Sequence, residues 1–569
     1  MATVAAFHQW EVLDQKLEKA IATYLDACTA LESSASADPA STNDLVPRID
    51  RRLDSFSTCL SQRLTSAHSS IVRTRNKLVS PAHRLPNEIL LKIFHMVIYS
   101  IDVKETSQLR CEYAIRTIYR HVHALAGVCS VWRRVGLDEA FWSLVPIIEH
   151  PSGRYMTTAA QLSLERAPNH RLCLAGYLKD NLPDIPDFIT KVLLKHGARF
   201  DSINLQSGSL AGLAQCMGAL IDSTSGGQVS AKSLSLHYST CTQPGLHRPQ
   251  GVTERLFPVD SSRWPESECL TSSLRVLHIR GLQLPIEDLS LRNLTQLTLQ
   301  GISLNNNLVF ASSLRALASS SQLKTLEIIS VLVLIWTTEE DFLRDLPIFL
   351  PSLQCLYMED LLAPLIQLTL RSISAGSHLV AINWTDSSSS SLRGLSAPLF
   401  PTEMSLREFK IDVLFISGGR YTLRQRINHI RFTLETLPTI TSLYLDSLVI
   451  DSEVLDGLMP TAVTHEEPHT NPRGFPELKA LHISRSHCHD PKALQLLPKV
   501  VASHPLEELG IGIGTECSCS PIPSCQDGFG SEIELVWESL ANAGPKLRRL
   551  PTKGSEISHI QFEKSIWRL

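Results

Sequence analysis

Residues 274–279 read Leu-Arg-Val-Leu-His-Ile, and this spacing of apolar residues, Leu-x-x-Leu-x-Leu, returns along most of the chain's second half. Nearly all intervals between copies fall between 20 and 38 residues, a period typical of repeat proteins. We expect each copy to form a short strand with two inward-pointing residues behind an anchoring one. The copies begin at Leu274, Leu294, Leu323, Leu353, Leu379, Leu406, Ile440, Leu478 and Leu506, with weaker copies at Phe200 and Ala231 and the start of another at Leu547.

Helical segments are predicted between these strands. Residues 493–501 have apolar side chains at helical spacing, and residues 531–543 do so before a Gly544-Pro545 stop. Strands that alternate with helices over short links are parallel, with the helices on one side, and such units stack into a curved solenoid. The period resembles that of leucine-rich repeats. Because the usual Asn or Cys after the third leucine is largely absent, we expect an irregular α/β solenoid over residues 169–569.

Composition is that of an ordinary globular protein. Of 569 residues, 43% are hydrophobic and 19% charged, and the net charge is -4. This balance excludes long-range disorder and argues against a chain-wide field for nucleic acid or membrane binding. Apolar runs stay far below the roughly 20 residues that cross a bilayer. With no visible export signal and 13 scattered cysteines, we expect reduced thiols and a cytoplasmic or nuclear location.

Residues 1–80 carry two amphipathic patterns, separated by a polar linker at residues 33–44. The first has apolar residues at Leu13, Leu17, Tyr24, Cys28 and Leu31. The second steps by three and four residues for about four heptads, which predicts a continuous apolar seam. Its members are Leu45, Ile49, Leu53, Phe56, Leu60, Leu64, Ala67 and Ile71. We expect a helical hairpin or coiled-coil-like arm, paired within itself or between chains.

The second helix of this arm is basic, with seven Lys or Arg against Asp50 and Asp54. A solvated face explains such a charge run, and a patch for nucleic acid or an acidic partner is the alternative. Because no aromatic residues interleave with the charges, the solvated face is favoured.

Residues 81–150 predict three helices. Pro86 and Glu88 suit a first helical turn, where Pro loses no hydrogen bond and Glu faces the positive end of the helix dipole. An apolar stripe follows up to Ile98. A second helix is expected to carry Leu125 to Val135, and a short third one Phe141 and Trp142, with Asp138 as its N-cap.

The string RLPNEILLKIF, followed by LAGVCSVWRRVGLDEAFWSLV, resembles an F-box-like motif, as found in F-box-like proteins of mushroom-forming fungi. The resemblance implies a three-helix unit that binds a Skp-type adaptor and thereby docks on a cullin ubiquitin ligase. The residues that it assigns to adaptor binding are Leu85, Pro86, Ile89, Leu90, Ile93, Phe94, Val128, Cys129 and Trp132, and Glu88, Arg133 and Trp142 also match. A helical unit of this size buries only part of its apolar surface, so the rest must meet a partner or remain exposed.

One departure separates the chain from the compact motif. Phe94 and Leu125 lie 31 residues apart. The insert is expected to form a longer first helix and a loop, or else to weaken adaptor binding. The alternative is that these apolar residues form only the internal core of three helices.

Enzyme chemistry finds little support in the sequence. His487-Cys488-His489 and the cysteines at 517, 519 and 525 lack the spacing of a zinc site. Gly510, Gly512 and Gly514 do not match a dinucleotide-binding loop, and Walker, nucleophile-elbow and His-Glu-x-x-His motifs are absent. We therefore expect no catalytic residues, no metal and no cofactor, although an enzyme of an unrecognised class remains a third hypothesis.

The sequence thus favours a substrate receptor of a Skp–cullin–F-box ubiquitin ligase whose solenoid binds a target protein. The alternative is an interaction scaffold without ligase function. Insertions between repeats are candidate recognition elements, and functionless surface loops are the other interpretation. They span residues 237–266, 386–398, 460–476 and 515–530.

Overall fold

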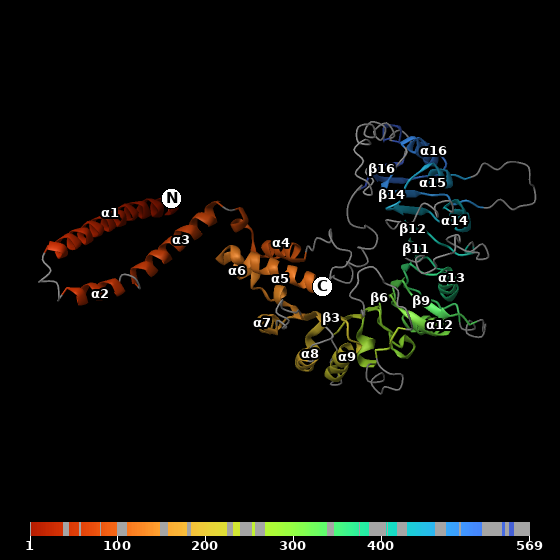
Figure 1. Cartoon of the computed structure of the whole chain (residues 1–569), viewed down its shortest axis with the longest axis horizontal. Coiled ribbons are helices and arrows are strands. Elements are labelled where there is room, and N and C mark those ends of the chain that lie inside the picture. The colour runs from red at the N-terminus through yellow and green to blue at the C-terminus, as the bar shows by residue number, and fades with distance from the viewer. Residues whose placement is uncertain are drawn as a thin grey trace, which may run out of the picture. The chain divides into compact units, whose positions relative to one another are not determined.

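The structure is a computed structural model of the whole chain (Figure 1). It divides into two units, residues 1–92 and 93–569, which are described separately. The residues that it describes are 2–37, 45–55, 59–79, 81–99, 111–147, 157–178, 184–224, 231–238, 253–256, 268–337, 346–374, 376–385, 406, 408–417, 430–460, 474–488, 491–514, 537–540 and 545–550.

The N-terminus is helical, as the apolar periodicity predicted. It consists of α1 (Ala2–Ala37), α2 (Val46–Ser55) and α3 (Ser61–Val79), followed by a 3-10 turn at Pro81–Arg84. Phe56 of the predicted seam and residues 38–44 of the linker lie outside the described residues. The periodicity is sufficient for helix formation here, although the described side chains of α1 are exposed along its length.

The predicted F-box-like region contains α4 (Asn87–Tyr99), α5 (Cys111–Val128), α6 (Ser130–Gly136) and a 3-10 turn at Glu139–Trp142. The insert lengthens the first helix to Tyr99 and supplies most of α5, and residues 100–110 lie outside the described part. The prediction of one helix through Leu125 and Val135 is wrong. Cys129 is extended, with φ -160° and ψ 173°, and its sulfur accepts the Trp132 N–H at 3.4 Å, so it ends one helix and caps the next.

Fourteen described strands form one parallel sheet whose spatial order follows chain order. A strand that pairs with its predecessor and its successor in the chain is the arrangement of a repeat solenoid. The strands are β1 (Leu144–Ile147), β2 (Leu172–Leu178), β3 (Phe200–Ser207), β4 (Ser233–Tyr238), β5 (Val276–Arg280), β6 (Gln296–Gln300), β8 (Thr325–Ile329), β10 (Cys355–Glu359), β11 (Leu379–Thr385), β12 (Val413–Ser417), β13 (Ser442–Asp446), β14 (Ala480–His487), β15 (Glu508–Gly514) and β16 (Lys546–Arg549). A separate parallel pair joins β7 (Ser303–Asn306) and β9 (Leu332–Ile335).

Helices between the strands lie along the outer side of the curved sheet (Figure 1). Apolar side chains of neighbouring strands pair in register beneath them, as in the buried row Leu277, Leu297, Leu326 and Leu356. The helices are α7 (Thr157–Arg166), α8 (Asp184–His196), α9 (Leu210–Thr224), α11 (Glu268–Ser273), α12 (Asn307–Ala316), α13 (Ala363–Ser372), α14 (Ile430–Thr436), α15 (Ser452–Gly457) and α16 (Leu497–Ala502), with 3-10 turns that include Ile286–Asp288 and Pro491–Leu496. None of the helices in the described part is long and apolar enough to cross a bilayer.

Most predicted repeats correspond to observed strands, but for some of them the predicted inward-pointing residues differ from the observed ones. The sheet begins two strands before the first predicted copy. At β1, Trp142, Val145 and Ile147 have the motif's spacing and are buried, but Trp142 was assigned to a helix. In β2, the buried Leu172 pairs with Phe200 but lies two residues before Leu174 instead of three, because the register shifts there.

Leu379 is exposed, and Val380 takes the inward place beside Leu356. The copy at Leu406 is also displaced, since Leu414 of β12 pairs with Leu443. In both copies, neighbouring apolar residues offer two registers for the strand, although Ser377 occupies the anchoring place before Val380, and only pairing with the neighbouring strand selects one.

A backbone ladder replaces the missing Asn or Cys side chains. The residue just after several strands has positive φ, at Gly281, Gly301, Ser330, Asp360 and Ser447. Its N–H donates to a carbonyl at or near the end of the next strand, over 2.8 to 3.1 Å. At Gly281, a Cβ would collide with the carbonyl oxygen of Tyr238, so glycine is required there. The turn therefore satisfies its polar groups without the usual side-chain ladder.

Candidate functional site

Helix α4 has two apolar faces, one exposed and one buried. Ile89, Met96 and Val97 are exposed, with 64% of the Met96 surface accessible, and they recur at the spacing of one helix face. Leu90, Phe94 and Ile98 are buried. A helix that is apolar on both faces has more apolar surface than this chain covers.

The nine predicted adaptor-binding residues divide by burial. Leu85, Pro86, Ile89 and Val128 are exposed, Ile93, Cys129 and Trp132 are half-buried, and Leu90 and Phe94 are buried. Leu90 and Phe94 are thus core residues of this chain rather than surface contacts. The sequence analysis left out Met96 and Val97 as site residues, although their spacing from Ile93 was a usable signal.

Phe94 is held by aromatic neighbours. Its ring meets Trp132 edge-on at 5.0 Å between centroids and lies 6.1 Å from Phe141. Such edge contacts add to the area that the rings bury. Trp132 is therefore oriented by the core while part of its surface stays open.

Trp142 fixes the helices to the start of the sheet. It is almost fully buried, its Nε1 donates to the Gly136 carbonyl over 2.9 Å, and the Arg166 guanidinium lies 4.0 Å from its ring centre. Nearby, the Tyr119 hydroxyl donates to the Leu144 carbonyl over 2.8 Å and contacts Ser163. Burial raises the pKa of Tyr119 well above its usual range. Asp138 caps the turn before Trp142, as predicted, by accepting the Ala140 N–H.

The inner face of the sheet, opposite the helices, carries buried polar side chains. Thr298 donates to Glu327 Oε2 over 2.8 Å. On the neighbouring strand, Tyr357 pairs with Glu327 in register and donates over 2.5 Å to Oε2 of Glu359, two residues further along. Asn383 Nδ2 donates to the Tyr357 hydroxyl over 3.0 Å. The pKa of Glu327 is raised to about 7, chiefly by burial; the Thr298 hydrogen bond opposes this rise and the charge of Glu359 adds to it.

We expect Glu327→Gln to remove part of the pH dependence of stability. Glu327 has a folded pKa of about 7 against a model-peptide value of 4.5. The folded state therefore binds more protons between these values, and stability falls as pH rises through that window, by about 3 kcal/mol. Urea unfolding at pH 4.5 and pH 8 measures the difference.

His278 acts in the opposite direction, because burial lowers its pKa to about 4 and its contribution to stability rises with pH. The wild-type curve mixes both groups, so the comparison of Glu327→Gln with wild type isolates the carboxyl. His278→Gln is the matched control and leaves the Glu327 contribution in place. An unchanged slope in Glu327→Gln contradicts the raised pKa.

An aromatic row follows on the same inner face. Phe415 stacks on Tyr444 at 4.5 Å between centroids, and Tyr444 stacks on His482 at 4.5 Å and 4°. Gly510 continues the row, where a Cβ would press on the His482 ring. Burial lowers the pKa of His482, which favours the neutral ring in this stack. The row joins an apolar cluster of Ile329, Tyr357, Ala381 and Val413.

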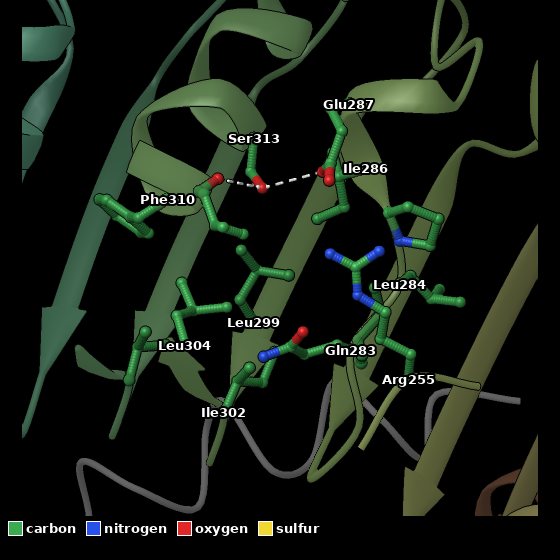
Figure 2. A pocket seen from close by; sticks show the side chains of 14 residues that line it. Arg255, Gln283, Leu284, Ile286, Glu287, Leu299, Ile302, Leu304, Phe310 and Ser313 are labelled. Atoms are coloured by element: carbon green, nitrogen blue, oxygen red, sulfur yellow. Dashed lines mark hydrogen bonds between the residues drawn. The ribbon is translucent and has the colours of Figure 1, made fainter. Parts of the chain in front are cut away.

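A hollow lies between α12, the turn at Ile286 and strands β5 and β6 (Figure 2). It measures about 470 Å³ with the solvent at its mouth. Gln283 donates to the Ser303 carbonyl and Ser313 to Glu287, while Arg255 supplies a cation (Figure 2). The other lining side chains are chiefly apolar, with no His or Cys among them.

Metal-ligating clusters of three or more His, Cys, Asp or Glu are absent from the described residues. His489 and the cysteines at 517, 519 and 525 lie outside those residues, as do the insertion at 386–398 and the one at 515–530. Of the other two insertions, only 237–238, 253–256, 460 and 474–476 are described.

The sheet order and the backbone ladder define a leucine-rich-repeat-like solenoid behind a helical N-terminus. No family model matches the chain, and no curated protein does. Among solved structures, an internalin from Listeria monocytogenes is similar with 12% identity, over 68% of this chain and 92% of that one, at a TM-score of 0.23. At that TM-score the similarity carries no argument, and the class rests on the strand order.

Proposed function

We propose that this protein is a substrate receptor of a Skp–cullin–F-box ubiquitin ligase, acting in the cytoplasm or nucleus. The observation that carries the proposal is the exposed apolar face of α4, with Ile89, Met96 and Val97. Clustered apolar side chains that remain exposed are typical of a protein-binding surface. Leu85 and Val128 are further exposed apolar residues of the motif.

The solenoid would hold the target protein. The inner face of its sheet offers aromatic rings and hydrogen-bonding groups in rows, and repeat proteins bind partners through extended surfaces of this kind. The receptor would accelerate ubiquitin transfer by proximity alone, because a tethered target has a high effective concentration near the ligase's carrier enzyme. In this proposal the chain itself supplies no catalytic group.

A non-ligase scaffold is the second candidate, and one observation favours it. Helix α5 packs against β2, and the ring of Trp142 in the following 3-10 turn contacts Arg166 of α7. Several apolar residues of the motif therefore have a structural role inside the chain, whether or not an adaptor binds.

We expect Ile89→Arg to weaken binding of a purified Skp-type adaptor at least 100-fold. A charge at an exposed apolar anchor must be desolvated on binding, and anchors of this kind dominate interface energies. Calorimetric titration measures the affinity. Because Ile89 is exposed, the unfolding midpoint should remain unchanged.

The matched control is Phe349→Arg, which places the same charge at an exposed apolar position of the solenoid. It should bind the adaptor as wild type does. A wild-type chain that fails to bind the adaptor, or an Ile89→Arg variant that binds it equally well, favours the scaffold.

A further inference from the structure

The apolar seam of α1 is exposed to solvent in the part of the chain that the structure describes. Residues 6, 10, 13, 17, 20, 24, 27 and 31 alternate steps of four and three, and all are apolar or aromatic. Leu13 is 54% exposed, and every described side chain of α1 is exposed. A heptad pattern over this length is a helix-pairing surface.

The second seam, on α2 and α3, is equally open. Ile49 and Leu53 of α2, and Leu64 and Ile71 of α3, are exposed. No residue of α3 is buried. Two seams on one arm therefore face solvent together.

The two seams carry opposite charge. Helix α1 has five acidic and two basic side chains, whereas α2 and α3 together have seven basic and two acidic ones. Pairing α1 with α1, or α3 with α3, would bring like charges together. Pairing α1 with α2 and α3 brings opposite charges together, and such flanking charges select helix partners.

The length of the arm helices and the width of the apolar face of α1 indicate that α1 packs against more than one helix. Helix α1 has 36 residues, about 54 Å, and α2 and α3 have 10 and 19, about 44 Å together. Phe7, Ile21 and Leu25 widen the apolar face of α1 beyond its seam and are exposed. A single facing helix covers only a narrow seam, so this wide face requires a bundle.

We propose that the arm, residues 2–79, is a dimerisation element whose occupant is the arm of a second copy. Two arms form a bundle in which each acidic α1 lies between basic helices. A two-fold axis creates both acidic-on-basic contacts at once, because every chain brings one element of each sign. The proposal does not depend on the adaptor.

The test is the mass of the full-length protein in solution, measured by light scattering and sedimentation equilibrium. We expect about twice the chain mass of 63.1 kDa for wild type. Leu17→Glu, which places a charge in the seam, should yield the single-chain mass. The matched control is Val12→Glu, which adds the same charge outside the seam, about 110° around α1 from its centre, and should remain dimeric.

Circular dichroism tests whether the variants are folded. Both variants should retain the wild-type spectrum and the unfolding midpoint of the solenoid. Raising NaCl from 0.05 to 0.5 M should weaken the dimer severalfold, because it screens the acidic-on-basic contacts. A wild-type monomer, which would mean that the arm closes on itself, overturns the proposal. So does a Leu17→Glu dimer, and an affinity insensitive to salt overturns the alternation of charge.

Discussion

Replacing Asp446 with alanine is expected to lower the free energy of unfolding by about 3–5 kcal/mol. Its carboxylate accepts Arg485 Nε at 2.8 Å and also contacts the second guanidinium nitrogen. Ser484 adds a hydrogen bond of 2.6 Å. Both charged side chains are almost fully buried, at 10% and 6% exposure. Alanine removes the Asp446 carboxylate from a guanidinium in the interior, which is costlier than losing a surface pair.

Urea unfolding followed by circular dichroism measures this loss. Glu408→Ala is the matched control, because Glu408 pairs with Arg371 at 3.5 Å while both side chains are more than half exposed. An exposed pair contributes at most about 1 kcal/mol. Equal effects of the two substitutions would show that the Asp446 pair is not buried.

Replacing Trp142 with alanine is expected to cost about 3–5 kcal/mol as well, because it opens a cavity between the helices and the sheet. The ring is almost fully buried, and the substitution also leaves the Gly136 carbonyl without its donor and Arg166 without its aromatic contact. Thermal and urea unfolding of the full chain measure the loss.

Two further variants serve as comparisons for this loss, one at Trp142 and one at an exposed position. Trp142→Phe keeps most of the ring and should cost clearly less than Trp142→Ala. Phe349→Ala, at a side chain that is two-thirds exposed, should change stability by less than about 0.5 kcal/mol. A Trp142→Ala variant as stable as Phe349→Ala would mean that this tryptophan does not hold the helices to the sheet.

The repeats were predictable because leucine spacing reports burial directly. From Leu274 to Leu356 the motif falls on the observed strands, since only one set of apolar residues can point inward. At Leu379 and Leu406 neighbouring apolar residues offered two registers, so local spacing could not choose. β1 was missed because its anchoring residue, Trp142, was assigned to a short helix, and residues 144–147 alone are a short apolar run that suits a strand or the end of a helix.

The predicted adaptor-binding residues include both exposed and buried side chains for a related reason. The motif identified apolar residues on a helix but not the side of that helix which the chain covers. Phe94 is buried because Trp132 and Phe141, more than 35 residues away in sequence, lie against it. The proximity of the two inner-face carboxylates could not be predicted from the sequence either, because Glu327 and Glu359 become neighbours only when β8 pairs with β10.

By itself, the sequence determined the helical arm, the repeating strand-and-helix order and the absence of recognisable enzyme motifs, because these depend on periodicities that act over a few residues. Tertiary structure alone decided which apolar residues stay exposed, the register of the ambiguous strands and the raised pKa of Glu327. Burial and charge proximity are sums over neighbours distant in the chain, and no local pattern contains them.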